Sequence, residues 1–273
     1  MRISFAILFG MALLAGCGKS KVERIEWTTM GTVAAVQTKG GVASPEMLET
    51  VKAEFERVNA HFNIRDPKAP IHEIALISDA GIQSYDAVFP YACYAEALVL
   101  RDLSGGAFNP RWRGPDTLDM GAIAKGFAVD LAADAVRERD RAAGGTMPDT
   151  LIDLGGNLKA VKGSWRTGIA GSEMTIELAE GFACATSAEY YRGKHIYDGR
   201  TGLAVSNGVE SVTVIVGGSA MEADGLSTTL FVLGPEEGRR FLDEKWGKPG
   251  VRAIWFMSDG TCIGHCSCPT RLR

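Results

Sequence analysis

Residues 119–130 read Asp-Met-Gly-Ala-Ile-Ala-Lys-Gly-Phe-Ala-Val-Asp, and apolar residues recur through them at helical spacing. The stretch therefore predicts a helix that begins at Asp119. The first N–H groups of a helix have no partners within it, and the positive end of the helix dipole suits a phosphate group. Gly121 and Gly126 would let the backbone approach such a ligand closely, and Lys125 adds a positive charge. The plainer interpretation is a packing helix with Asp119 as its cap.

The segments on both sides of this stretch predict helices and strands in no regular alternation. Ser44-Pro45-Glu46 is typical of a helix start, because serine caps a helix, proline fits its first turn and an acid complements its dipole. Helices are expected over residues 45–62, 85–103, from 119 onward, 220–232 and 235–246, and strands within 25–38, 150–161, 165–170, 175–178, 181–186, 209–216 and 251–257. Residues 63–80 are expected to be irregular. This order favours an α+β fold with largely antiparallel sheets flanked by helices.

Length and charge bound the classes of protein to which the chain can belong. Its 273 residues include 29 Lys and Arg and 33 Asp and Glu, which gives a net charge of −4. This balance gives no support for nucleic-acid binding, which requires a basic face. The chain is long enough to bury a substantial core.

The N-terminus predicts an export signal followed by a lipid anchor. Arg2 precedes a largely apolar run over residues 3–14, which is too short to span a bilayer comfortably. Leu14-Ala15-Gly16-Cys17 then resembles a bacterial lipobox, in which Cys17 would take lipid after cleavage. We therefore expect a lipoprotein signal peptide at 1–16, a lipidated tether at 17–24 and a single catalytic domain at 25–273. The product would be an exported, membrane-anchored lipoprotein that faces the periplasm or the cell surface; an ordinary secretory signal with a chance cysteine is the alternative.

Three cysteines near the C-terminus, Cys262, Cys266 and Cys268, cluster around His265. In an exported protein such a cluster is first interpreted as a disulfide, here from Cys262 to Cys266 or Cys268. Free thiols, and a metal or redox site that includes His265, are the alternatives. The spacing matches no common zinc pattern.

Asp224 and Thr228 lie four residues apart in a segment expected to be helical, so both side chains would project from one face. A carboxylate and a hydroxyl, joined by a backbone carbonyl from elsewhere, make a hard oxygen site that suits Mg²⁺ holding a diphosphate. The plainer interpretation is a helix cap and a core threonine. Glu222 is expected to be solvated or to lie outside the set of direct ligands.

His195 is the histidine with the most suggestive surroundings, because Asp198 and Arg200 follow it closely. It could accept a proton from an incoming hydroxyl group or form a hydrogen bond to a nucleotide. Without other information, a lone histidine is more often structural.

Several further segments complete an ordered pattern with residues 119–130. They are Met30-Gly31-Thr32, Gly106-Ala107-Phe108-Asn109-Pro110, Asp153-Leu154-Gly155-Gly156-Asn157, Ala185-Thr186-Ser187 leading through Tyr190 and Arg192 to His195, and Ala223-Asp224-Gly225 leading to Thr228. In number and order these motifs, from about Met30 to Gly234, resemble the ApbE family of FAD:protein FMN transferases.

The resemblance implies a Mg²⁺-dependent transferase that moves FMN from FAD, its substrate, to a threonine of an acceptor protein and releases AMP. The acceptor would be a flavoprotein, foremost a membrane redox subunit. The metal ligands would be Asp224, Thr228 and the backbone carbonyl of Ala122. His195 is the expected base, with Asp224 as the competing candidate. The residues expected to bind the flavin nucleotide are Met30, Ala107, Phe108, Asn109, Asp119, Lys125, His195 and Ile196.

The sequence departs from the family pattern mainly in the expected flavin pocket. Asn109 replaces an acid, Ala188 a glycine and Gly199 a proline, and residues 61–74 lack an expected tyrosine. These differences concern flavin affinity and pose rather than diphosphate chemistry. The same residues would serve a Mg²⁺-dependent FAD pyrophosphatase that yields FMN and AMP. A non-catalytic FAD-binding lipoprotein is a third interpretation.

Overall fold

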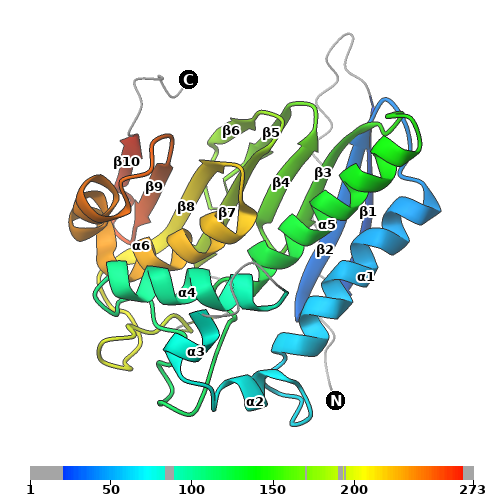
Figure 1. The fold of residues 1–273 in the computed structure, drawn as a ribbon. Helices are drawn as coiled ribbons and strands as arrows, with labels where there is room; N and C mark the ends of the chain where they lie inside the picture. The colour runs from blue at the N-terminus through cyan, green and yellow to red at the C-terminus, as the bar shows by residue number, and fades with distance from the viewer. Residues whose placement is uncertain (1–20, 84–88, 170, 190–192, 194, 267–273) are drawn as a thin grey trace, which may run out of the picture.

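An eight-stranded antiparallel sheet forms the centre of the fold (Figure 1). The computed structural model describes residues 21–83, 89–169, 171–189, 193 and 195–266, so the predictions for Cys17, Tyr190, Arg192 and Cys268 lie outside the described residues. Along the sheet the strands follow the order β1 (Val22–Thr29), β2 (Thr32–Lys39), β3 (Asp149–Leu154), β4 (Asn157–Lys162), β7 (Phe182–Ala188), β8 (Val209–Gly217), β9 (Arg252–Met257) and β10 (Cys262–Cys266). Every neighbouring pair is antiparallel, which confirms the predicted fold class.

Helices cover one face of the sheet and a β-hairpin lies on the other (Figure 1). The helices of the chain are α1 (Pro45–Phe62), α2 (Ile71–Ile74), α3 (Asp79–Gln83), α4 (Tyr91–Leu103), α5 (Ala124–Ala142), α6 (Ala220–Phe241) and the π-helical turn η1 (Leu242–Trp246). Helices α5 and α6 lie on the sheet, α1 packs beside α5, and α4 packs against α6. The hairpin consists of β5 (Trp165–Gly168) and β6 (Thr175–Leu178). Among the described helices, none is long and apolar enough to cross a membrane.

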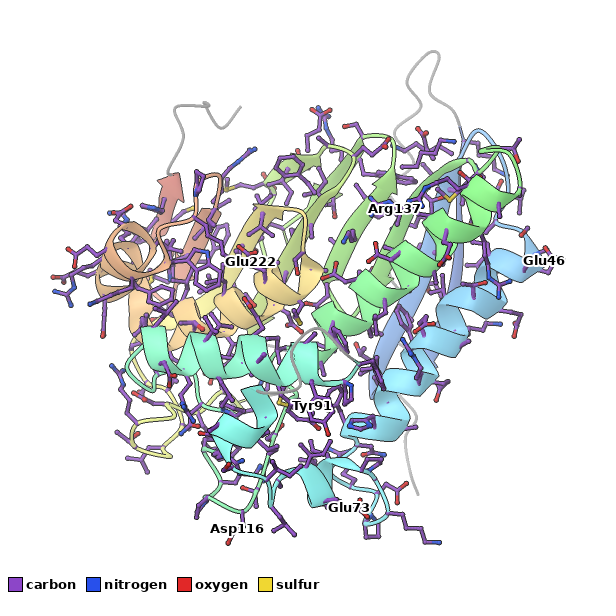
Figure 2. All side chains as sticks on the ribbon, viewed as in Figure 1. Glu46, Glu73, Tyr91, Asp116, Arg137 and Glu222 are labelled. Atoms are coloured by element: carbon purple, nitrogen blue, oxygen red, sulfur yellow. The ribbon has the colours of Figure 1, made fainter. Side chains whose placement is uncertain are left out.

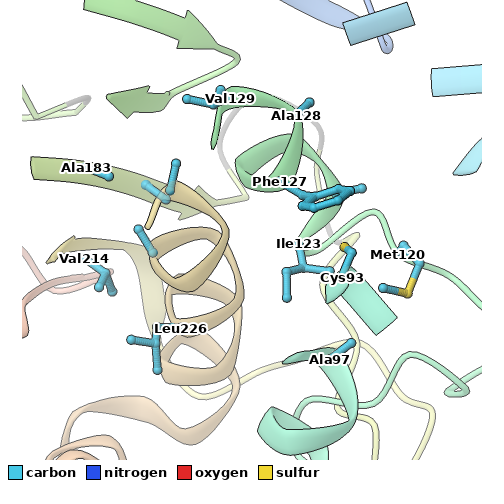
Figure 3. Packing of buried hydrophobic residues seen from close by; sticks show 14 of the residues in the cluster. Cys93, Ala97, Met120, Ile123, Phe127, Ala128, Val129, Ala183, Val214 and Leu226 are labelled. Carbon is cyan, nitrogen blue, oxygen red and sulfur yellow. The ribbon is translucent and has the colours of Figure 1, made fainter. Parts of the chain in front are cut away.

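Two apolar layers lie on the two faces of the sheet, because side chains alternate along each strand. Ile152 of β3 belongs to the larger layer under the helices, and Figure 3 shows Phe127 and Leu226 in that layer. Its neighbour Leu151 belongs to the smaller layer, together with Trp165 of the hairpin. The site described below lies within the helical layer.

Helix α1 begins where the sequence predicted. The Ser44 hydroxyl accepts a hydrogen bond from the Met47 N–H at 3.1 Å, and Pro45 occupies the first turn. Val51 and Phe55, one turn apart, are fully buried, as the helical spacing of the apolar residues requires.

Helix α5 begins at Ala124 rather than at Asp119, so the predicted start was wrong. The Asp119 carboxylate accepts a hydrogen bond from the Gly121 N–H at 3.0 Å, and residues 120–123 form no helix. Aspartate competes with the helix in this way because its short side chain can bond nearby backbone groups. Asp119 is therefore the start of a turn that precedes the helix.

Two other helix boundaries follow from proline and glycine. Helix α4 begins at Tyr91, directly after Pro90, because proline disfavours helical structure in the residue before it; the predicted start at residue 85 lies outside the described residues. The prediction of two helices over residues 220–246 is confirmed, since Gly234, with φ 71° and ψ 176°, interrupts α6 immediately before Pro235. The region 63–80 is less irregular than expected, since it contains α2 and the start of α3.

The last strand of the sheet, β10, was not predicted. It pairs with β9 after a turn, and Ile263 lies opposite Trp255.

Within β10, Cys262 and Cys266 are four residues apart, or about 13 Å along an extended chain. A disulfide requires Cα atoms within about 7 Å, so the predicted Cys262–Cys266 bridge is wrong. Cys262 is an exposed free thiol whose Sγ lies 4.0 Å from Met174 Sδ.

Candidate functional site

Asp224 lies where the beginning of α5 meets the first turns of α6. The residue is 4% exposed. Asp224 Oδ2 accepts a hydrogen bond from the Gly126 N–H at 3.0 Å, and Lys125 Nζ lies 3.4 Å from both carboxylate oxygens. Burial raises the pKa of Asp224, while the Lys125 ammonium opposes that rise. A buried carboxylate with one cation at this long distance can accept a second, closer cation.

Gly126 permits the close meeting of the two helices. A Cβ atom at this position would lie 2.2 Å from the backbone oxygen of Ala220 and 2.8 Å from the Cβ of Asp224. The sequence indicated correctly that a close backbone approach occurs at Gly126. The neighbour that requires it is helix α6 rather than a ligand.

Ala122 lies in the turn that precedes α5, before the N-cap residue Ile123. The first bond of the helix runs from the Phe127 N–H to the Ile123 oxygen at 3.1 Å, so Ala122 stands outside the helical ladder. The Gly126 N–H is one of the first N–H groups of the helix, which lack a partner within it, and it donates to Asp224. Lys125 Nζ also donates to the Gly121 oxygen at 3.0 Å. Its ammonium therefore bridges the turn before α5 and the Asp224 carboxylate.

Thr228 follows Asp224 by one turn of α6, so helical geometry places both side chains on one face, as predicted. Thr228 Oγ1 lies 3.1 Å from Ser187 Oγ of β7. Carboxylate, hydroxyl and carbonyl oxygens are the hard donors that Mg²⁺ prefers. The ion pair between Lys125 and Asp224 also indicates that this part of the structure stabilises positive charge. The residues present therefore fit a divalent cation.

Glu222 lies in the first turn of the same helix (Figure 2). Its Oε2 is 3.3 Å from Lys248 Nζ, and its side chain is 15% exposed. The carboxylate is thus engaged by a surface lysine; that Glu222 lies outside the set of direct ligands stays a prediction.

Asp130 anchors the start of α6, a role that the sequence did not reveal. Its carboxylate accepts hydrogen bonds from the N–H groups of residues 220 and 221, at 2.9 and 3.0 Å, and from Ser219 Oγ at 2.8 Å. The nearly buried Lys159 of β4 forms an ion pair with the same carboxylate. Asp130 therefore ties α5 and β4 to the helix that presents Asp224. The one available signal was its place at the end of the stretch 119–130.

A second group of predicted residues surrounds the turn at residues 106–110. The Gly199 N–H donates to the Ala107 oxygen at 3.0 Å, and Asn109 Nδ2 donates to the Gly199 oxygen at 3.3 Å. These bonds join the turn to the loop that follows His195. The side chains of Ala107 and Phe108 are buried in the core, so they support the turn from inside.

Asp119 connects the two groups. Its N–H donates to the Pro110 oxygen at 2.8 Å, and its carboxylate accepts a hydrogen bond from Arg113 Nε at 3.0 Å as well as the one from Gly121. The segment from Asp119 to Ile123 thus begins beside the turn at 106–110 and ends beside the Asp224 cluster.

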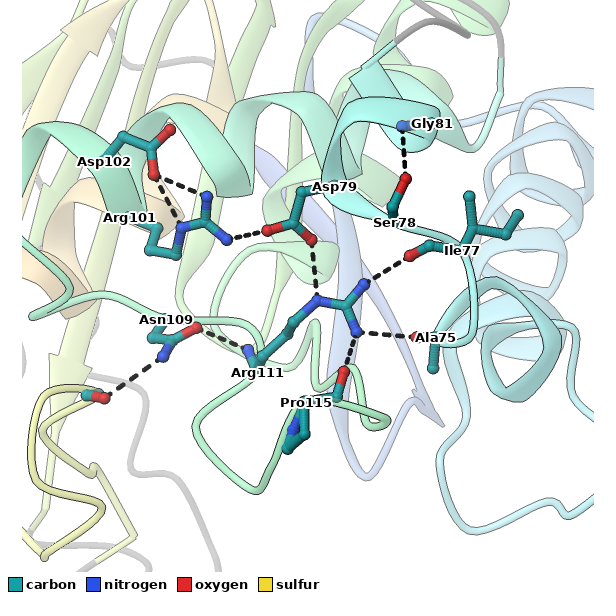
Figure 4. A network of polar contacts seen from close by, with 11 residues as sticks. Ala75, Ile77, Ser78, Asp79, Gly81, Arg101, Asp102, Asn109, Arg111 and Pro115 are labelled. Atoms are coloured by element: carbon teal, nitrogen blue, oxygen red, sulfur yellow. Dashed lines mark hydrogen bonds and ion pairs between the residues drawn. The ribbon is translucent and has the colours of Figure 1, made fainter.

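Arg111 holds the outer side of the same turn (Figure 4). Its guanidinium donates to Asp79 Oδ1 at 2.9 Å and to the oxygens of Ala75 and Ile77 at 2.8 and 2.9 Å, and it also contacts the Pro115 oxygen. A planar guanidinium with five N–H groups is suited to fix several oxygens at once. This role could not be read from the sequence, since three of the four acceptors, on Ala75, Ile77 and Asp79, belong to a distant segment.

His195 is exposed in the loop before Ile196, whose side chain is buried. His195 Nδ1 lies 2.7 Å from the Gly193 oxygen. A carbonyl can only accept a hydrogen bond, so Nδ1 carries the hydrogen and Nε2 of the neutral ring keeps a free lone pair. Within the described residues no contact joins His195 to Asp224, so the two candidates for the base occupy separate places.

Met30 adopts a strained backbone conformation in the turn between β1 and β2. Its φ is 48°, and the φ of the next residue, Gly31, is 69°. The left-handed region costs a residue with a side chain about 1 kcal/mol or more, and turns of this shape prefer asparagine followed by glycine. The Met30 side chain packs against the core, partly buried. Strain of this kind, retained at a predicted nucleotide-binding residue, is typical of a functional position.

The sheet and its helical cover define an α+β protein, in which the buried Asp224 carboxylate lies between α5 and α6. Residues 112–255, more than half of the chain, match the sequence profile of the ApbE family. The chain belongs to the ApbE family.

Curated relatives carry the name FAD:protein FMN transferase. The protein from Klebsiella pneumoniae (strain 342) is 34% identical over 170 residues, which cover 57% of this chain and 50% of the relative. The protein from Treponema pallidum (strain Nichols) is 30% identical over 183 residues, which cover 57% of this chain and 48% of the relative. The chain thus spans about half the length of the curated relatives it matches.

Solved structures of the family share the fold over nearly the whole chain. The apo form of the flavinyl transferase ApbE from Pseudomonas stutzeri superimposes with a TM-score of 0.71 at 20% identity, covering 93% of this chain and 97% of that one. The ApbE protein from Thermotoga maritima gives a TM-score of 0.69 at 20% identity, covering 89% of this chain and 96% of that one. At this identity the likeness establishes the fold.

Proposed function

We propose that this protein is a Mg²⁺-dependent FAD:protein FMN transferase that moves FMN from FAD to a threonine of an acceptor protein and releases AMP. The observation that carries the proposal is the buried Asp224 carboxylate, which lies beside Lys125 and the start of α5, with Thr228 one turn further along α6. Family membership and the names of the relatives support the same activity.

The Asp224 carboxylate, the Thr228 hydroxyl and the Ala122 carbonyl would hold Mg²⁺. Bound there, Mg²⁺ would neutralise charge on the FAD diphosphate and polarise a phosphoryl oxygen. Asp224 supplies the negative charge, and Gly126 fixes its orientation through the 3.0 Å hydrogen bond. Lys125, released from Asp224, would donate to a phosphate or ribose oxygen.

The transfer itself exchanges one P–O bond for another. The threonine hydroxyl oxygen of the acceptor attacks the FMN phosphorus, while Nε2 of His195 takes the hydroxyl proton. The bond from that phosphorus to the bridging oxygen breaks, and AMP leaves with that oxygen. A phosphoester-linked FMN remains on the acceptor. We favour His195 over Asp224 as the base because its Nε2 has no partner among the described residues, whereas Asp224 is engaged by Gly126 and Lys125.

We expect His195→Gln to lower kcat for transfer by about 10² to 10⁴-fold, the usual contribution of a positioned base. Glutamine keeps a polar side chain, so the Kd for FAD should change less than about threefold. Single-turnover transfer rates and a titration of FAD fluorescence test this; a variant that transfers FMN at the wild-type rate would rule out His195 as the base.

We expect Met30→Asn to separate stability from flavin binding. Asparagine tolerates the left-handed region, so the free energy of unfolding should stay within about 0.5 kcal/mol of the wild type or rise. The Kd for FAD should increase up to about tenfold, because a thioether–aromatic contact contributes up to about 1.5 kcal/mol. Thermal unfolding and a titration of FAD fluorescence measure the two effects. Unchanged FAD affinity would remove Met30 from the binding site.

A FAD pyrophosphatase is the second candidate, and the exposure of His195 favours it, because water can reach this base. AMP and free FMN should be measured with Mg²⁺, with and without an acceptor that presents a threonine. The transferase releases AMP in step with acceptor labelling, whereas the hydrolase yields AMP and free FMN without an acceptor. Tight FAD binding with neither product would instead indicate a non-catalytic FAD carrier.

We further propose that residues 25–273 form one catalytic domain, that Cys17 carries a lipid anchor, and that the acceptor is an exported membrane redox subunit. The lipobox-like sequence Leu14-Ala15-Gly16-Cys17 supports the anchor. Labelling with a radioactive fatty acid should mark the full chain and should fail in Cys17→Ser. Equal labelling of both would contradict the anchor.

A further inference from the structure

The side-chain hydroxyl groups of Thr228, Ser187 and Ser227 form a chain. Ser187 Oγ of β7 lies 3.1 Å from Thr228 Oγ1 and 2.8 Å from Ser227 Oγ. Ser227 Oγ lies 2.9 Å from the backbone oxygen of Asp224. Ser227 is fully buried, and Ser187 and Thr228 are half-buried. The chain therefore runs from Thr228 through Ser187 and Ser227 to a carbonyl oxygen.

The direction of every hydrogen bond in this chain follows from a count of protons. Each hydroxyl has one hydrogen to donate and two lone pairs that accept, and a carbonyl oxygen has none to donate. The contact with the Asp224 oxygen must therefore use the hydrogen of Ser227. The Ser187–Ser227 contact then uses the hydrogen of Ser187. The Ser187–Thr228 contact is left with the hydrogen of Thr228.

The Thr228 hydroxyl consequently has no hydrogen left to donate to a ligand, and its oxygen can offer a ligand only a lone pair. A hydroxyl whose hydrogen is committed elsewhere presents lone pairs, which attract a cation and repel a phosphate oxygen. A free hydroxyl would instead turn its hydrogen toward a phosphate, or toward the carbonyl one helical turn before it. The partner that decides between these states is Ser187.

We propose that Ser187 is a positioning residue that commits the hydroxyl hydrogen of Thr228 and so makes Thr228 a ligand for a divalent cation. The inference rests on the proposed function, because it assumes the cation site at Asp224 and Thr228. Groups that orient a metal ligand from behind typically contribute 10- to 100-fold to metal affinity.

The test is a titration of the full-length chain with Mn²⁺, in which the electron paramagnetic resonance signal of free Mn²⁺ reports binding. We expect Ser187→Ala to raise the Kd for Mn²⁺ about tenfold. Ser187→Thr keeps the hydroxyl and should restore the wild-type Kd. Thermal unfolding monitors the folding of each variant. If Ser187→Ala does not fold, Ser187→Cys, a weaker acceptor of similar volume, replaces it with the same expected direction.

Thr186→Val is the matched control. Its hydroxyl lies 2.8 Å from Thr213 Oγ1, and it projects from the opposite face of the sheet because side chains alternate along β7. The variant removes the hydroxyl group next to Ser187, and with it the hydrogen bond to Thr213, but leaves the chain to Thr228 intact, so its Kd for Mn²⁺ should match the wild type.

Asp224→Ala separates failure of this inference from failure of the proposed function. If Asp224→Ala abolishes Mn²⁺ binding while Ser187→Ala binds as tightly as the wild type, the role of Ser187 is overturned and the metal site stands. If Asp224→Ala and the wild type bind Mn²⁺ equally, or neither binds it, the metal site falls and the role of Ser187 falls with it. Equal losses in Ser187→Ala and Thr186→Val would show a general structural effect and would also overturn the inference.

Discussion

Asp224→Ala is expected to lower the rate of FMN transfer by at least about a thousandfold, the upper part of the range for loss of one electrostatic stabiliser from an active site. Asp224 is the one proposed metal ligand that carries a negative charge. Its removal also leaves the Gly126 N–H without its acceptor and the Lys125 ammonium without its carboxylate partner. The transfer rate should be measured at saturating FAD with a range of Mg²⁺ concentrations.

Asp224→Asn distinguishes a lost charge from a lost shape. Asparagine has nearly the same volume and can still accept a hydrogen bond from Gly126, so the protein should fold, yet transfer should stay strongly impaired. Glu222→Gln is the matched control, because Glu222 lies two residues away on α6 and pairs with Lys248. It should transfer FMN at nearly the wild-type rate. Full activity in Asp224→Asn would exclude the metal assignment.

Asp130→Ala is expected to lower the free energy of unfolding by about 3–5 kcal/mol, the cost of removing one partner from a buried ion pair. Lys159, whose side chain is 6% exposed, would lose its carboxylate. The first turn of α6 would lose the acceptor of three hydrogen bonds, from Ser219 and from the N–H groups of residues 220 and 221. For a chain of this size the midpoint of thermal unfolding should fall by about 10 °C.

The control for Asp130 lies one turn further along α5. The side chain of Asp134 is 73% exposed, and its nearest oxygen lies 3.6 Å from Arg137 Nη1. Asp134→Ala should change the free energy of unfolding by less than about 0.5 kcal/mol, since exposed ion pairs contribute little. Removing both partners, in Asp130→Asn with Lys159→Met, should recover part of the loss. Equal effects of Asp130→Ala and Asp134→Ala would contradict the anchoring role.

The parts of the fold that the sequence predicted correctly are governed by local rules. Ser44 and Pro45 fix the start of α1 through a cap and a favoured backbone angle, and Gly234 with Pro235 breaks α6. The four-residue spacing of Asp224 and Thr228 carries over directly from sequence to helix face. Each of these statements depends on residues within one or two turns of each other.

The errors arose where a partner from elsewhere decides the local structure. Asp119 was expected to open the helix, but its bonds to Pro110, Arg113 and Gly121 hold it in a turn before α5. The strand β10 depends on pairing with β9 more than on the propensity of its own residues.

In the candidate site, too, local sequence patterns predicted some residues, and contacts with distant segments determine the others. Its acidic and hydroxyl residues, Asp224 and Thr228, could be named from their motif. The residues that hold the site in place could not, because Asp130, Ser187 and Arg111 act through contacts with segments far away in the sequence. Gly126 was expected to approach a ligand, and only the packing of α5 on α6 reveals what it accommodates.

The most direct test of the proposed function is the mass of an acceptor protein. The full-length chain should be incubated with FAD, Mg²⁺ and a domain that presents a threonine to the site, and the acceptor should then be examined by mass spectrometry. We predict a mass gain equal to one phosphoester-linked FMN on that threonine, absent with EDTA and absent with Asp224→Ala. An acceptor of unchanged mass, while FAD is converted to AMP and free FMN, would contradict transfer and identify a hydrolase.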